Sequence, residues 1–331
     1  MNKRFLLSTS CIVTILTSAL SNGATLLPVY NDGSGEGFND PTLGADRKSA
    51  FEFALSLWSN VLVDSYIGEI IEVEVQFDPL GGSASSATLA QAGPRGSGSV
   101  SGDPLGSNVF YPGALRNHLS GSDQVQPTVE NVSGAEISAT FNSDVDGSVV
   151  LGSTTFYYGI DDNAPSNTTD FVSTALHEIG HGLGWSGSLK TVDGEYLNQD
   201  PERINSFDFF VQRTSTSTPL ESLSPADRLT AVTTDDISWS GAAGVAANGG
   251  TAPDLFGPSP AKPGSSYSHL DEGDFPTELM SPQATAGTGH TLSPLTLAIL
   301  EDQGWATTTI PEPSGLLLLA TSLLCWGRRK R

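Results

Sequence analysis

The sequence has almost no cysteine. Its 331 residues include only Cys11 and Cys325, and each lies in a terminal segment with the features of a targeting signal. If both segments are removed, the remaining chain has no disulfide and no thiolate that can bind a metal. A metal site in this protein would therefore depend on histidine and carboxylate ligands, and its fold on a buried hydrophobic core.

Basic residues are scarce as well. The chain has 15 lysines and arginines against 37 aspartates and glutamates, and six of the basic residues lie at the two ends. Residues 5–327 contain the nine others and all 37 acidic residues, which gives this part of the chain a net charge of −28. Such a charge argues against binding to nucleic acid or anionic lipid and favours solubility.

The N-terminus has the order of parts of a secretion signal. Lys3 and Arg4 precede a mostly apolar stretch, residues 5–20, and small residues follow up to Ala24. We expect cleavage by signal peptidase between Ala19 and Ala24, so that residues 1–24 form a signal peptide. An uncleaved membrane anchor is the alternative, but the apolar stretch is shorter than the roughly 20 residues that a span needs.

The C-terminus combines three features in a fixed order. Pro311-Glu312-Pro313 precedes an apolar run from Gly315 to Trp326, and four basic residues close the chain. Residues 311–331 thereby resemble the PEP-CTERM sorting signal of Gram-negative bacteria. The resemblance implies recognition by an exosortase after transient anchoring in the inner membrane, and a final location outside the cell, at its surface or in the extracellular matrix. A simple tail anchor is the alternative, but the apolar run is too short to cross a bilayer comfortably.

Hydrophobic periodicity between the two ends predicts an α+β fold. Helical spacing of apolar residues runs through 51–62 and 294–303, and alternation predicts strands at 69–77, 137–141 and 153–158. No internal repeat is visible.

Other stretches lack these signals. Residues 25–45 are rich in Gly, Asn and Asp, and residues 81–107 are rich in Gly and Ser, so we expect irregular structure in both. Asp144-Val145-Asp146-Gly147 predicts a hairpin turn. The same four residues are compatible with the start of a calcium-binding loop, but nothing else in the sequence supports bound calcium.

An H-E-x-x-H motif spans His177 to His181. On a helix this spacing places both imidazoles on one face, one turn apart, where they can share a metal ion. Glu178 follows the first histidine and can reach a water molecule beside the metal. We expect a helix that Thr168 or Thr169 caps and that ends near Gly184.

Catalytic zinc usually has three protein ligands, and the motif supplies only two. The metzincin pattern H-E-x-x-H-x-x-G-x-x-H places the third histidine at position 187, where this chain has Gly187. His269 and Met280 occur further along, and Met280 lies in the sequence Glu-Leu-Met-Ser-Pro.

This combination resembles the leishmanolysin family of metzincins. In that family an insertion separates the helix from the third histidine, and a methionine turn follows soon after. The resemblance runs with gaps from about Asp170 to Trp305, and it implies zinc bound by His177, His181 and His269, with Met280 in the turn beneath the metal. Two departures are clear: residues 25–310 lack the family's many disulfides, and the stretch between the second and third ligands shows no resemblance.

The two remaining histidines receive structural interpretations. We expect His118 to be a surface or loop residue. His290 follows a Gly/Thr-rich loop, and we expect a structural role for it; a position at the border of the cleft is the alternative.

The sequence therefore predicts a metzincin-like α+β protein of two lobes. The upper lobe would span about 25–185 and the lower, loop-rich lobe about 186–310, with one zinc ion between them. The expected function is an exported zinc endopeptidase in which Glu178 is the general base. Two alternatives remain open, which are a catalytically inactive surface or matrix protein with this fold and a zinc hydrolase of non-peptide bonds.

A protein or peptide substrate needs a surface on which to lie. We expect the strand 137–141 to be the edge of the sheet, where an extended peptide can pair with free N–H and C=O groups. The residues of this predicted binding strand are Ile137, Ser138, Ala139, Thr140 and Phe141.

Overall fold

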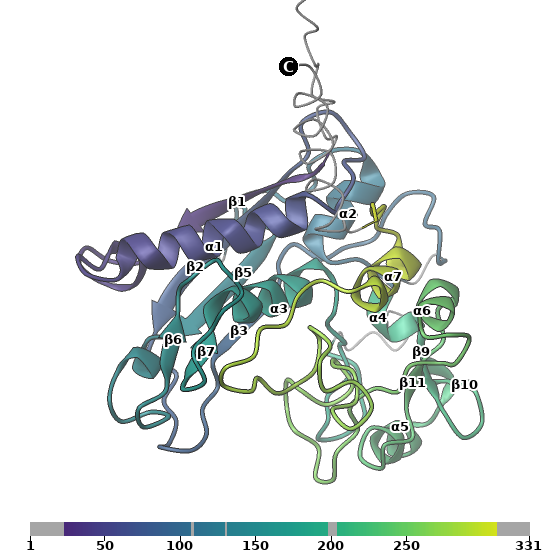
Figure 1. The fold of residues 1–331 in the computed structure, drawn as a ribbon. Coiled ribbons are helices and arrows are strands. Elements are labelled where there is room, and N and C mark those ends of the chain that lie inside the picture. Colours follow the sequence, from purple (N-terminus) through teal and green to yellow (C-terminus); the bar gives the residue numbers. More distant parts are fainter. Residues whose placement is uncertain (1–22, 107–108, 130, 198–203, 310–331) are drawn as a thin grey trace, which may run out of the picture.

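The computed structural model describes residues 23–106, 109–129, 131–197 and 204–309 (Figure 1). Both cysteines, the sorting signal at 311–331 and all but two residues of the expected signal peptide lie outside these ranges. The described residues form an α+β fold with several sheets, as the sequence predicts. Among them, no helix is both long and apolar enough to cross a membrane.

The largest sheet has four strands in the order β1-β2-β5-β3. Its first three strands are parallel, and β3 is antiparallel to β5. The strands are β1 (Thr25–Tyr30), β2 (Ile70–Asp78), β5 (Ile137–Asn142) and β3 (Ala90–Pro94). The central strand β2 alternates buried apolar and partly exposed polar residues, which is the pattern of a sheet with one covered face.

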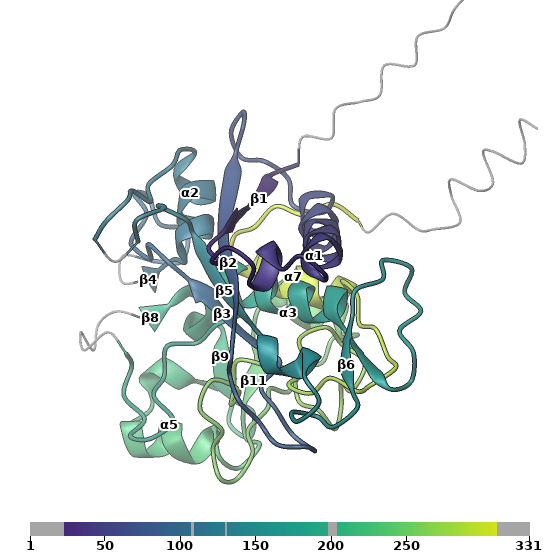
Figure 2. The same cartoon turned by 90° about the vertical axis from the view of Figure 1, so that its left-hand side faces the viewer.

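Two helices, α1 (Gly44–Ser59) and α3 (Phe171–Leu183), cover the same face of this sheet and pack against each other (Figure 2). Between helices and sheet lies a cluster of phenylalanines, in which the rings of Phe141 and Phe171 are 4.6 Å apart and those of Phe77 and Phe171 are stacked at 5.7 Å. Trp58 of α1 donates a hydrogen bond to the carbonyl oxygen of Leu176, so α3 is fixed against its neighbour as well as against the sheet.

Shorter elements connect these parts. They are the 3-10 helices η1 (Gly37–Asn39) and η2 (Ser143–Asp146), the helix α2 (Gly113–Ser120), and the strands β4 (Val109–Phe110), β6 (Thr155–Tyr157) and β7 (Thr168–Asp170). The strands β6 and β7 form a parallel pair that leads directly into α3.

The chain after α3 has short elements joined by long loops. A small antiparallel sheet, β10-β9-β11, lies beyond the C-terminal end of α3, apart from the main sheet (Figure 1). The elements of this region are β8 (Ile204–Asn205), α4 (Ser206–Phe209), β9 (Val211–Arg213), β10 (Thr218–Pro219), η3 (Leu220–Ser222), α5 (Pro225–Ala231), β11 (Ser238–Trp239), α6 (Ala242–Ala247) and α7 (Pro294–Gln303).

The final helix α7 has the bounds that the sequence predicts. Ser293 caps its N-terminus by accepting a hydrogen bond from the Thr296 amide, and Gly304 follows its last residue. Trp305 then donates a hydrogen bond of 2.9 Å to the carbonyl oxygen of Leu183. The segment just after α7 is thereby tied to the end of α3.

Several sequence-based expectations are wrong. Residues 25–30 form β1 within a stretch expected to be irregular, and residues 90–94 form β3 within the expected loop. The β3 sequence, Ala-Gln-Ala-Gly-Pro, contains no β-branched or aromatic residue and so gives no strand signal. Residues 143–146 form a 3-10 helix, not a hairpin turn, because Asn142 accepts a hydrogen bond from the Asp144 amide and caps it.

The predicted substrate strand is also not the edge of the sheet. Residues Ile137 to Phe141 belong to β5, which pairs with β2 on one side and with β3 on the other. Its backbone groups are occupied on both sides, and the strand at this edge is β3. The error follows from the missing strand signal at 90–94, because without β3 the strand β5 would be outermost.

Candidate metal centre

The helix α3 carries the H-E-x-x-H motif, and a side-chain cap fixes where the helix begins. Asp170 accepts a hydrogen bond of 2.6 Å from the Ser173 amide and is the N-cap, whereas Thr168 and Thr169, which we expected in this role, belong to β7. The helix ends at Gly184, whose φ of +135° lies outside the range that other residues readily adopt. This helix is buried on almost every side.

His177, His181 and His269 converge on one point. Their Nε2 atoms are separated by 3.0 Å (His177 to His181), 3.0 Å (His177 to His269) and 3.1 Å (His181 to His269). Within the described residues, these three histidines are the group of side chains that could hold a metal ion. The structure thus brings the distant His269 to the two motif histidines, as the resemblance implies.

The opposite ring nitrogen of each histidine meets a backbone carbonyl oxygen. The Nδ1 atoms contact Leu279 at 2.7 Å for His177, Trp185 at 2.5 Å for His181 and Ser265 at 2.8 Å for His269. A carbonyl can only accept, so Nδ1 must carry the proton in all three rings and Nε2 presents a lone pair to the common point.

Electrostatics favour the same protonation state. Burial lowers the pKa of His177 to about 3 and also lowers the pKa of His181 and His269, with the neighbouring imidazoles adding to the effect at His177 and His269. All three rings are therefore neutral at pH 7, which is the form that binds metals.

The donor set fits zinc. Tetrahedral zinc with bonds of roughly 2.0–2.1 Å to nitrogen needs about 3.3 Å between its ligand atoms, which is close to the observed separations. Three imidazoles suit zinc better than calcium or magnesium, which prefer oxygen ligands. The possible calcium ligands Asp144 and Asp146 do not gather: the first accepts from the Gly81 amide, and the second pairs with Arg47.

Met280 lies against α3 beside Gly180, the residue before His181. It is fully buried, and its sulfur lies 2.8 Å from where a Cβ on Gly180 would stand, so only glycine leaves it room there. Its carbonyl oxygen accepts a hydrogen bond of 3.0 Å from the Leu270 amide. The turn that contains Met280 therefore contacts both the helix of the first two histidines and the segment of the third.

Glu178 lines the same cleft as the three histidines. The cleft has a volume of about 1280 Å³, and its walls include β3, α3, residues 262–269 and residues 279–290. The side chain is only 6% exposed, and burial raises the pKa of its carboxyl group to about 8. A carboxylate with a raised pKa beside a metal site is suited to accept a proton near neutral pH.

The two other histidines lie elsewhere. His118 is buried in α2, where its Nδ1 lies 3.0 Å from a carboxylate oxygen of Glu69 and its ring 4.7 Å from that of Trp305. The expectation of a surface or loop residue is wrong because this carboxylate supplies a buried partner. His290 borders the cleft, and its backbone is held by Ser173 through bonds in both directions.

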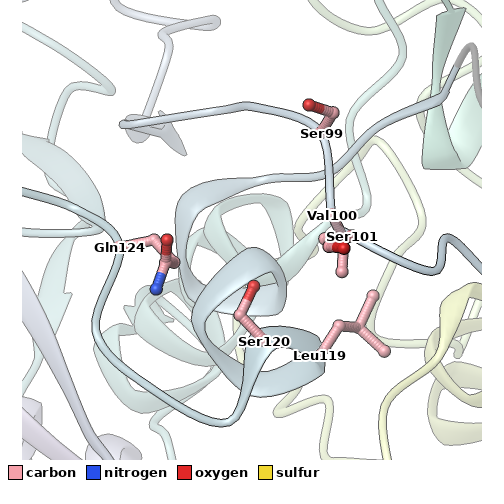
Figure 3. A pocket seen from close by; sticks show the side chains of 6 residues that line it. All are labelled: Ser99, Val100, Ser101, Leu119, Ser120 and Gln124. Carbon is pink, nitrogen blue, oxygen red and sulfur yellow. The ribbon is translucent and has the colours of Figure 1, made fainter.

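A smaller hollow at the end of α2 offers no comparable chemistry (Figure 3). Its lining contains no titratable side chain and no metal ligand, and consists of Ser99, Val100, Ser101, Leu119, Ser120 and Gln124. The cleft at α3 is therefore the candidate functional site.

Comparison with known proteins adds nothing to this geometry. No family model matches the sequence, and no curated protein matches it either.

Proposed function

We propose that this chain is an exported zinc endopeptidase with a two-lobed, metzincin-like architecture. The observation that carries the proposal is the convergence of three neutral imidazoles, two from α3 and one from a segment 88 residues later, in a cleft that Glu178 also lines. A structural zinc site is closed by four protein ligands, whereas three ligands beside an open cleft are typical of a catalytic one.

Different residues of the site would bind the metal and transfer the proton. His177, His181 and His269 would hold the zinc ion through Nε2. When bound, zinc polarises a carbonyl group and lowers the pKa of a water molecule. Glu178 takes a proton from the attacking water and passes it to the nitrogen of the leaving amine. The carbonyl oxygens on Nδ1 keep the three imidazoles in the required tautomer throughout.

The edge strand β3 supports a peptide as substrate. Leu89 accepts a hydrogen bond from the Asn142 amide and Arg95 donates one to Glu136, so the odd-numbered residues of this segment bond to β5. The N–H and C=O groups of Ala90 and Ala92 therefore point away from β5, and both residues line the cleft. An extended peptide can pair with them antiparallel, with its scissile bond near the histidines.

One experiment tests this function against its two alternatives. The purified protein is analysed for metal and assayed on a broad peptide mixture, with and without a chelator and with zinc added back. One zinc per chain together with chelator-sensitive peptide cleavage supports the endopeptidase. Zinc without cleavage of any peptide supports either the inactive protein or the hydrolase of non-peptide bonds, and ester and amide substrates then separate those two.

We also propose that the protein leaves the cell through its two terminal segments. The support is the sequence alone, because residues 1–22 and 310–331 lie outside the described residues. Mass spectrometry of the native exported protein should give an N-terminus between residues 20 and 25 and a C-terminus near 311–314. Recovery of intact Arg331 from the exported pool would contradict processing by an exosortase.

A further inference from the structure

The space at Gly187, where the uninterrupted metzincin pattern has its third histidine, is filled by another residue. A Cβ on Gly187 would lie 2.1 Å from ring atoms of Tyr267, so only glycine at 187 leaves room for this ring. Tyr267 precedes His269 by two residues and is 2% exposed. The segment that carries the distant ligand therefore docks on the chain just beyond α3.

The hydroxyl of Tyr267 is held in a buried polar network. It donates a hydrogen bond of 3.0 Å to Oδ1 of Asp208 in α4 and accepts one from the Leu189 amide. Asp208 is fully buried and also accepts from the amides of Ser188, at 3.0 Å, and Asn205, at 3.3 Å. A buried carboxylate that accepts this many bonds has little freedom to move.

The backbone then directs His269 toward the other two ligands. Tyr267 has a φ of +54°, a left-handed conformation that is unfavourable for a residue with a side chain and needs support from its surroundings. Hydrogen bonds flank it on both sides: the Tyr267 amide donates to Phe256, the Phe256 amide donates to His269, and the Gly187 amide donates to Ser268 Oγ at 3.2 Å.

We propose that Tyr267 and Asp208 are positioning residues that hold His269 in place for the metal. This inference rests on the proposed zinc site. The insertion between Gly187 and His269 removes the short covalent link that would keep a third ligand near α3. Tyr267 and Asp208 restore the constraint without touching the metal: the Tyr267 hydroxyl accepts a bond from the Leu189 amide and the Asp208 carboxylate accepts one from the Ser188 amide, both just after the helix, and the two side chains are bonded to each other.

The experiment compares zinc affinities of the full mature chain by competition with a chelator. Tyr267→Phe removes both bonds of the hydroxyl, and Gly187→Ala displaces the ring. Loss of groups that orient metal ligands typically costs about 10–100-fold in affinity, and we expect each variant to raise the Kd for zinc by about tenfold. The visible spectrum of the Co²⁺-substituted protein should change as well, because the third imidazole is less well fixed.

Tyr196→Phe is the matched control. Tyr196 is a buried tyrosine of the same region, and its hydroxyl has no hydrogen-bond partner among the described residues, so the Kd for zinc should not change. The melting temperature of the metal-free protein separates positioning from stability. A purely structural role would lower that temperature in Tyr267→Phe and leave the zinc Kd and the Co²⁺ spectrum as in the wild type.

The outcomes distinguish the inference from the function on which it rests. Wild-type protein that binds no zinc overturns both. Wild-type protein that binds zinc, together with unchanged Kd values in Tyr267→Phe and Gly187→Ala, overturns only the positioning role. If Tyr267→Phe does not fold, Ser268→Ala replaces it, because that change removes the hydrogen bond from the Gly187 amide to the segment of His269. We then expect the Kd for zinc to rise severalfold. An unchanged Kd would refute the positioning role.

Discussion

At the scale of single residues, the site depends on which atom of each imidazole is protonated. Each Nδ1 is committed to a backbone carbonyl, so the three Nε2 lone pairs face one another at 3.0–3.1 Å. Three lone pairs at this distance repel, and a cation between them removes the repulsion. In the proposed zinc site all three residues are needed together, because no pair of them supplies the ligand number of catalytic zinc.

His269 should be the third zinc ligand. In His269→Ala we expect zinc content to fall well below one per chain after dialysis, because only two protein ligands remain. His290→Ala is the matched control, since His290 borders the same cleft but does not belong to the group of three, and it should retain one zinc. Inductively coupled plasma mass spectrometry measures both. The opposite pattern would transfer the ligand role to His290.

Glu178→Gln should retain zinc and lose hydrolysis. The amide has nearly the shape of the carboxylate but cannot take a proton from water, and general acid–base groups contribute roughly 10²–10⁴-fold to the rate. Measurement of kcat on a peptide substrate, with zinc content determined in parallel, checks this. Activity within a few-fold of the wild type would exclude Glu178 from the mechanism.

At the scale of elements, the cleft is lined by a helix, α3, and an edge strand, β3, which pack against each other. The helix α3 fixes two histidines and Glu178, and β3 supplies backbone groups that no other strand of the main sheet uses. An exposed edge strand can pair with strands of other chains, but β3 borders a cleft that restricts access to its backbone. Recognition through the backbone makes few demands on side chains, so we expect broad sequence tolerance.

Proline substitutions separate the two sides of β3. Ala92→Pro removes an N–H that points toward the cleft, so we expect a KM raised severalfold, with zinc content and melting temperature nearly unchanged. Gln91→Pro is the matched control because its N–H bonds to β5; it should lower the melting temperature by several degrees. Peptide kinetics and thermal denaturation measure these effects. Unaltered kinetics in Ala92→Pro would show that substrates do not pair with this edge.

At the scale of the whole molecule, most of the negative charge remains on the surface, but some carboxyl groups are buried. Glu136, just before β5, is 4% exposed and accepts hydrogen bonds from the Glu72 amide at 2.7 Å and from the Asn117 side chain at 2.8 Å. Burial raises the pKa of Glu136 to about 7. The unfolded chain has the ordinary pKa of about 4.5, so the folded state holds this proton more tightly than the unfolded state does.

The stability of the protein should therefore depend on pH through Glu136. A group whose pKa is raised by folding stabilises most below its unfolded pKa, and that contribution is lost as pH rises through about 7. Relative to Glu136→Gln, the wild type should lose at most about 3 kcal/mol of unfolding free energy between pH 5 and pH 8. Urea denaturation at both pH values measures it. The substitution also alters the contact with Asn117, but that effect is the same at every pH, so an equal difference at pH 5 and pH 8 would contradict the prediction.

The sequence by itself determined the parts of this protein that depend on local pattern. The spacing of His177 and His181 placed both on one face of α3, and the apolar period and the flanking Ser293 and Gly304 set the bounds of α7. Both depend on interactions within about one helical turn, which a sequence displays directly. The expectation that His269 joins the motif histidines rests on a family resemblance of the sequence and not on spacing. No local interaction links His269 to His181, which lies 88 positions earlier.

Only the tertiary structure decided which strand forms the edge and how His269 is held beside the two motif histidines. The strand β3 contains no residue with strand preference and exists because β5 offers it a pairing partner. The burial of His118 depends on Glu69, and the place of Tyr267 depends on a missing side chain at Gly187. Each of these features is a contact between segments far apart in the chain, and a contact of that kind has no signal in the order of the residues until the chain is folded.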